Sequence, residues 1–198
     1  MSTHANRGTG PVRRRILEVV ARFLRSFGLR RQTEDPQAES RGFVLHRDLR
    51  LPPKSLRGKM CGDAFRTDSF YYLSAVLEAT KFSERLRGRK DARIVDIGSG
   101  LGRLATGLIA EVGEVHYLGI DANEEFVRWC KENIEALHPN FRFVHLDMAN
   151  DLYNPGGTIT RSDLRLPVDD AAADLVNLWG VFTNMVPEHG QAYVGGVG

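Results

Sequence analysis

The segment RIVDIGSGLGRLATGL, at positions 93–108, constrains the fold more than any other part of the chain. A β-branched run comes directly before three closely spaced glycines, and a helical pattern comes directly after them. We therefore expect a strand, a tight turn and the start of a helix. Glycine suits such a turn because the chain must bend sharply and bring its backbone N–H groups close to a ligand, which a Cβ would prevent. The three glycines are Gly98, Gly100 and Gly102.

The chain around this segment alternates between strand-like and helix-like patterns, which predicts a parallel α/β sheet flanked by helices. Apolar residues at helical spacing predict a first helix over 68–86, before the glycine segment. Asn123 is well placed to cap a later helix, because its side chain can accept a backbone N–H of the first turn. The expected strands are 93–97, 115–120, 141–146 and 175–178, and the expected helices between them are 102–112 and 124–137.

The first 60 residues differ in charge from the rest of the chain. They hold 14 Lys and Arg against 5 Asp and Glu, a net charge of +9, whereas residues 61–198 hold 13 against 20, a net charge of −7. Residues 13–27 place apolar side chains on one face and arginines on the other, which predicts an amphipathic basic helix. Residues 31–60 show little periodicity, which is typical of a linker or an irregular lid segment and not of a core element. We expect a basic leader over 1–60 and one α/β domain over 61–198.

The basic helix has two interpretations. Its arginine face fits weak contact with an anionic membrane surface or with nucleic acid, and the same pattern fits a helix that packs on its own domain or on a partner. Arg22 and Arg25 interrupt the apolar run, so we expect neither a membrane span nor a secretory signal. The two cysteines lie far apart without metal-ligand spacing, which favours a cytoplasmic protein with no metal site.

Two ligands compete for the glycine turn. Gly100, Gly102 and Ala105 satisfy the G-x-G-x-x-A fingerprint of dinucleotide-binding proteins. Against a diphosphate, Asp96 places a carboxylate at the end of the strand, where it suits a cationic ligand better than an anionic one. S-adenosylmethionine (SAM) carries a sulfonium and an ammonium group and no phosphate. The position of Asp96 therefore favours SAM.

Three further segments make the chain resemble the class I SAM-dependent methyltransferase family. YLGID ends the second strand with an acid that can accept both ribose hydroxyls, and FRFVHLDM ends the third strand with an acid that the resemblance places near the adenine. DLVNLWGVFTNM resembles the family's fourth strand and the loop where the methyl acceptor lies. The resemblance covers about 61–193 and implies a Rossmann-like sheet with SAM as cofactor. The implied cofactor-binding residues are Asp96, Gly98, Ser99, Gly100, Gly102, Asp121, Ala122, Asp147 and Met148.

The resemblance also implies a class of methyl acceptor. The motif YNPGG at 153–157 and the segment 166–188 resemble bacterial methyltransferases that act on small molecules or glycans, and not on nucleic acid. Relatives of that type often have His in place of Asn184, so this departure leaves a general-base role there unsupported. His145, Tyr153, Glu188 and His189 are the other candidates for a base, and we assign none of them as catalytic.

The family fold continues after the fourth strand with a helix, a fifth strand and a final hairpin, in the strand order 3-2-1-4-5-7-6. Only 20 residues follow Leu178, so we expect the C-terminal strands to be missing and the activity to be low. An exposed edge of the sheet would also promote self-association. Two alternatives to an enzyme of this kind stay open: a non-catalytic SAM-binding or scaffold module attached through the basic leader, and a nicotinamide-dependent oxidoreductase that uses the same loop.

Overall fold

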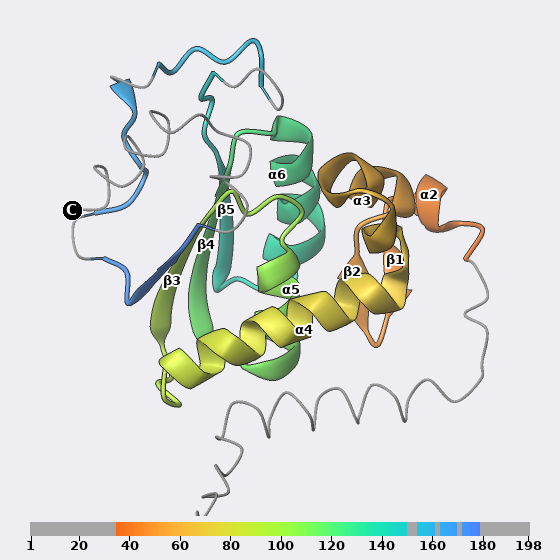
Figure 1. The fold of residues 1–198 in the computed structure, drawn as a ribbon, viewed down its shortest axis with the longest axis horizontal. Coiled ribbons are helices and arrows are strands. Elements are labelled where there is room, and N and C mark those ends of the chain that lie inside the picture. The colour runs from red at the N-terminus through yellow and green to blue at the C-terminus, as the bar shows by residue number, and fades with distance from the viewer. Residues whose placement is uncertain (1–34, 150–153, 161–162, 170–171, 179–198) are drawn as a thin grey trace, which may run out of the picture.

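The computed structural model of the chain describes residues 35–149, 154–160, 163–169 and 172–178 (Figure 1). The basic helix predicted over 13–27 lies outside these residues. So do Tyr153, Asn184, Glu188 and His189. The predicted association through an exposed sheet edge stays a prediction, because residues 179–198 also lie outside the described part.

A parallel sheet of four strands lies at the centre of the described chain, in the order β5-β4-β3-β6. The register of its central pair runs from Ala92 opposite Val115 to Ile97 opposite Ile120. The predicted parallel α/β fold is confirmed, and each predicted strand differs from the observed one by a single residue at one end. The strands are β3 (Ala92–Ile97), β4 (Val115–Asp121), β5 (Phe141–His145) and β6 (Leu175–Asn177).

Three helices pack against one face of this sheet: α4 (Asp68–Arg85), α5 (Arg103–Glu111) and α6 (Glu124–Cys130). Asn123 Oδ1 accepts the N–H of Phe126 at 3.1 Å, which confirms the predicted cap of α6. The helix predicted over 124–137 changes its hydrogen-bonding pattern part-way, because a π-helical turn occupies Lys131–Glu135. Such turns insert one extra residue per turn and alter which side chains face the core.

Alternation of side chains along the strands divides the core into two clusters. Ile94, Tyr117 and Phe143 face the three helices and form one buried cluster with them. Val95 and Ile120 point to the opposite face of the sheet. There they pack with residues that follow β5 in the chain, namely Leu146, Met148, Leu164 and Leu166.

The segment before α4 contradicts the prediction of a linker. Within the described part of 31–60, the chain forms α2 (Ala38–Arg41), a hairpin of β1 (Val44–His46) and β2 (Leu49–Leu51), and most of α3 (Lys54–Cys61). Two of its apolar side chains, Val44 and Leu51, are paired across the hairpin and buried against α4. Periodicity does not indicate α2, β1 and β2, because elements of three or four residues are too short to repeat a pattern.

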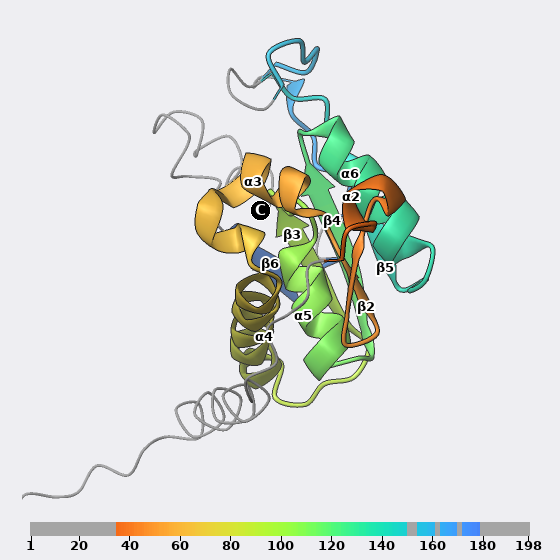
Figure 2. The ribbon, with the colours of Figure 1, turned by 90° about the vertical axis from the view of Figure 1, so that its right-hand side faces the viewer.

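This N-terminal segment is also bonded to α6. The indole N–H of Trp129, in α6, donates to the carbonyl oxygen of Gly42 at 2.7 Å. The hairpin therefore lies beside the helical layer and not apart from it, as both views of the ribbon show (Figures 1 and 2).

Helices α4 and α5 pack closely at Gly107, where a Cβ would overlap the carbonyl oxygen of Ala75. We expect Gly107→Ala to lower the free energy of unfolding by about 1–3 kcal/mol, because the two helices would have to move apart. Gly156→Ala is the matched control, since no atom lies within 4 Å of the added Cβ, and its effect should stay within about 0.5 kcal/mol. Urea denaturation measures both, and equal stability of the two variants would contradict this packing.

Candidate functional site

The glycine loop joins the carboxyl end of β3 to the start of α5. Gly98, Gly100 and Gly102 have φ angles of 75°, 54° and 68°, all in the left-handed region that favours glycine. The N–H groups of Gly98 and Ser99 both donate to the carbonyl oxygen of Ile120, at 2.8 and 3.1 Å. The predicted strand, turn and helix are confirmed, and the loop is bonded to the end of β4.

The three glycines are needed for different reasons. A Cβ on Gly102 would lie 2.6 Å from Ile134 Cδ1, inside the core. A Cβ on Gly100 would lie 2.6 Å from the sulfur of Met60. Gly98 is the exposed member of the three. Gly98 is therefore the position where a ligand has free access to the backbone of the loop.

Asp121 ends β4 beside this loop and is half-buried. Its Oδ2 accepts the N–H of Gly100 at 2.7 Å, and its Oδ1 accepts the N–H of Asn123 at 2.8 Å. Each carboxylate oxygen has a second lone-pair direction for a hydroxyl group. Burial raises the pKa of Asp121, while these two N–H groups oppose the rise because they favour the ionised form. This arrangement fits the acceptor role predicted for a ribose diol.

Asp96 ends β3 but is not open to a ligand, since only 3% of its surface is exposed. The hydroxyl of Tyr117 donates to Oδ2 at 2.5 Å, and the amide of Asn177 donates to Oδ1 at 2.7 Å. Burial raises the pKa of Asp96 to about 7, against the opposing effect of these two donors. The carboxylate thus lies beneath the loop, and it can favour a cationic ligand through its charge but not through an open oxygen.

Asp147 and Met148 follow β5, as predicted. Asn154 Nδ2 donates to Asp147 Oδ1 at 2.8 Å, and Thr158 donates both its hydroxyl and its N–H to Oδ2, at 2.6 and 3.1 Å. These three bonds lower the pKa of Asp147 and fix the described end of the YNPGG motif. Met148 is buried in the second core cluster. The predicted contact of both residues with adenine stays a prediction.

Ser99, Ala122 and His145 complete the predicted residues in the described part of the chain. Ser99 is buried, and its hydroxyl lies 2.9 Å from the position of a Cβ on Gly119, inside the sheet. The carbonyl oxygen of Ala122 lies 3.0 Å from Nε2 of His145. This contact occupies one ring nitrogen of His145 and gives no support to a role as general base.

The carboxyl edge of the sheet brings most of the predicted residues together. Besides the bonds above, the N–H of Leu146 donates to the carbonyl oxygen of Asp121 at 2.9 Å, which joins the ends of β4 and β5. Sequence reasoning missed three residues at this edge. Asn177 carried a signal, as a polar residue ending an apolar strand, whereas the other two, Met60 and Tyr71, lie outside every recognised motif.

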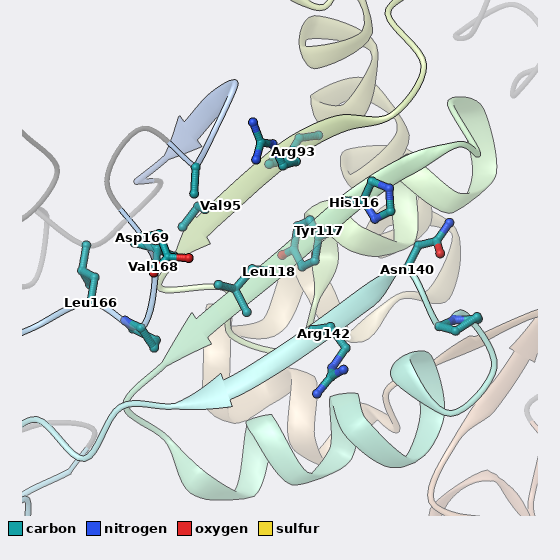
Figure 3. Close-up of a pocket in the computed structure, with 14 residues that line it drawn as sticks. Arg93, Val95, His116, Tyr117, Leu118, Asn140, Arg142, Leu166, Val168 and Asp169 are labelled. Atoms are coloured by element: carbon teal, nitrogen blue, oxygen red, sulfur yellow. The ribbon is translucent and has the colours of Figure 1, made fainter.

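A groove of about 580 Å³ lies elsewhere, over the amino-terminal half of the strands (Figure 3). Val95 and Leu118 contribute apolar surface to it, and Arg93 and Arg142 contribute cationic groups. It shares no residue with the predicted cofactor site. The glycine loop is at the opposite end of the strands, so this groove is not a candidate for the cofactor pocket.

The described residues contain no cluster of His, Cys, Asp and Glu that could hold a metal ion. In the same part of the chain, no helix is both long and apolar enough to cross a membrane. The cytoplasmic location and the membrane contact of residues 13–27 stay predictions.

Residues 94–194 match a family model described as a methyltransferase domain. The match takes in the glycine loop and the three strands after it, and it covers just over half of the 198 residues. The chain belongs to the class I SAM-dependent methyltransferase family. Membership of this family agrees with the strand order of the parallel sheet. Numbered from β3 along the chain, its four strands lie in the order 3-2-1-4.

The chain is similar to known methyltransferases over part of their length. The release factor glutamine methyltransferase of Deinococcus radiodurans is 27% identical over 168 residues, 80% of this chain and 60% of that protein. The ribosomal protein L11 methyltransferase of Caulobacter sp. is 31% identical over 144 residues, 71% of this chain and 44% of that protein. A SAM-dependent methyltransferase from Geobacter sulfurreducens, solved with S-adenosylhomocysteine (SAH), aligns with a TM-score of 0.39 at 22% identity, over 61% of this chain and 43% of that one. The chain spans 60% or less of each of these proteins.

The buried position of Asp96 predicts a pH-dependent stability. Its pKa rises from 3.8 to about 7 on folding, so the folded state holds an extra proton between these values and loses stability as the pH rises through them. Asp96→Asn removes this titration. We expect D96N to gain stability relative to the parent as the pH rises from about 5 to about 7, measured by urea denaturation.

Asp147→Asn is the control for this experiment, because the pKa of Asp147 is lowered and titrates below that range. Its stability difference from the parent should stay constant from about pH 5 to about 7. A constant difference for D96N as well would show that Asp96 is ionised in the fold throughout this range.

Proposed function

We propose that the chain provides the cofactor-binding part of a SAM-dependent methyltransferase, with the cofactor held by the loop 98–102 and by Asp121. The observation that supports this most is that the loop carrying exposed Gly98 is bonded, through Gly100, to the half-buried carboxylate of Asp121 at the end of the adjacent strand. Membership of the methyltransferase family supports it independently. When bound, SAM supplies the activated methyl group.

The residues of the loop edge would have separate tasks. Gly98 would allow close approach of the cofactor to the backbone, and Asp121 would accept hydrogen bonds from the ribose. Asp96, in its ionised form, would contribute a negative charge from beneath the loop. Two carboxylates at one edge disfavour a diphosphate, which would add further negative charge. The family match and these charges give the nicotinamide-dependent alternative no support.

The proposed work of the protein in the reaction is binding and orientation. Methyl transfer from a sulfonium requires a nucleophile held in line with the methyl group, and such alignment alone can supply a large part of the rate. Of the four candidate bases, His145 lies in the described residues, and its Nε2 contacts a backbone carbonyl. We therefore assign no general base.

The acceptor class is a separate proposal. The motif resemblance implies a small molecule or glycan, whereas the names of the two curated relatives specify a release factor and ribosomal protein L11. We favour a protein acceptor on the strength of these relatives. Incubation with methyl-labelled SAM and a cell extract, followed by separation by size, distinguishes label in protein from label in small molecules or glycans.

Calorimetry with SAH and NAD tests the cofactor assignment, and tighter binding of NAD would overturn it. We expect Asp121→Ala to weaken SAH binding by about 1–3 kcal/mol, because the ribose loses a charged acceptor. Asp174→Ala is the matched control. Asp174 bonds to the N–H of Arg93 at the amino ends of the strands, away from the loop. Equal losses in the two variants would show that Asp121 has no specific role in binding.

The charge of Asp96 predicts a different response of SAM and SAH to pH. Both ligands carry the same amino acid group, but SAM alone has a sulfonium charge. As Asp96 ionises near its pKa of about 7, its charge favours the sulfonium, so the preference for SAM over SAH should rise several-fold from about pH 6 to about 8. Glu78 and Arg103 also act on Asp96. Calorimetry on the parent and on Asp96→Asn separates the effect of Asp96 from theirs. An equal rise of the SAM preference in both proteins would contradict this role of Asp96.

A further inference from the structure

Helix α3 contacts the glycine loop through Met60. The thioether sulfur of Met60 accepts the N–H of Leu101, with a nitrogen-to-sulfur distance of 3.2 Å. The same sulfur lies 2.6 Å from the place that a Cβ on Gly100 would take. A side chain from the N-terminal segment is therefore in direct contact with the peptide between Gly100 and Leu101.

Arg57 fixes the position of α3 from inside the protein. Its side chain is fully buried, pairs with Asp68 in the first turn of α4, and donates to the carbonyl oxygen of Phe65 at 3.1 Å. At the end of the helix, Lys59 Nζ lies 2.9 Å from both carboxylate oxygens of Glu125 in α6. The exposed Lys59 pair contributes little, whereas breaking a buried pair is strongly destabilising. Of the two ion pairs that hold α3, the buried one at Arg57 therefore contributes more to fixing the helix.

Helix α4 contacts the same loop residue, Leu101, through its carbonyl group. The hydroxyl of Tyr71, fully buried, donates to the carbonyl oxygen of Leu101 at 3.1 Å. The N–H of the preceding residue, Gly100, is taken by Asp121. A loop whose backbone groups are bonded from three elements has little freedom to change its conformation.

We propose that Met60 is a positioning residue for the cofactor loop. Its bond to Leu101, made across the bare α-carbon of Gly100, keeps the loop in the left-handed conformation in which Gly98 and Asp121 face the cofactor. Gly100 then has two reasons to be glycine, its positive φ and the approach of the Met60 sulfur, and neither requires contact with the ligand. The effect on cofactor affinity rests on the proposed function, whereas the hold on the loop is a property of the unliganded chain.

Met60→Leu and Met60→Ala test the hold on the loop in the 198-residue chain without ligand. Leu keeps most of the apolar volume but offers no sulfur acceptor. Leu56→Ala is the matched control, because this partly buried side chain lies on the same helix and packs against the same core cluster. In nitrogen-15 NMR spectra, the Leu101 amide should shift in both Met60 variants and stay in place in L56A. An unshifted Leu101 amide in M60A overturns the proposal, whether or not the chain binds a cofactor.

Calorimetry with SAH measures the consequence for the cofactor. We expect M60A to weaken binding about tenfold and M60L to recover part of the loss, because an unfixed loop must be ordered on binding. L56A should change the affinity less than about twofold at a similar loss of thermal stability. A parent chain that binds no SAH overturns the proposed function. A parent that binds, with M60A binding equally well, overturns the role of Met60 alone.

The double variant M60A/G100A tests why position 100 is glycine. Gly100→Ala should disturb the loop amides, because its Cβ would collide with the Met60 sulfur and its φ of 54° disfavours any side chain. Removing the Met60 side chain should restore part of the parent spectrum and part of the SAH affinity. Absence of any rescue would show that the ligand or the backbone alone excludes a Cβ, which contradicts the proposal.

Discussion

The hydrogen bonds between the glycine loop and the end of β4 are the interaction on which the candidate site depends. Two loop N–H groups share the carbonyl oxygen of Ile120, and a third, from Gly100, bonds to the carboxylate of Asp121. These bonds place the loop against the strand that carries the proposed ribose acceptor. Because the acceptors follow one another in β4, the spacing of loop and carboxylate is set by the parallel register of β3 and β4.

Asp96 shows how the same edge tolerates a buried ionisable group. A carboxylate without water is costly unless it receives hydrogen bonds, and here one donor comes from each adjacent strand. Burial raises its pKa to about 7 although these donors oppose the rise, so its charge is sensitive to small changes around neutral pH. A bound cation would favour the ionised form, which couples the fold to the charge of the cofactor that we propose.

The N-terminal segment contacts the glycine loop through α3. Arg57 and Tyr71 are buried side chains of α3 and α4. Arg57 fixes the helix that carries Met60, and Tyr71 bonds to Leu101, the residue that Met60 contacts. The groove over the amino-terminal half of the sheet is lined by none of these four residues. Contacts from α3, α4 and β4 therefore meet at the loop, which lies at the carboxyl edge of the strands.

The sequence by itself determined the sheet, its helices and the nature of the glycine turn. Those features follow from local periodicity and from glycine chemistry, and the strand of Arg93 and the cap at Asn123 appear where the pattern predicts them. The tertiary structure alone decided which groups the polar residues meet. It buried Asp96 between Tyr117 and Asn177, and it placed Met60 on the loop. These contacts join residues between 21 and 81 positions apart, and no local pattern records them, because they arise only when separate elements pack together.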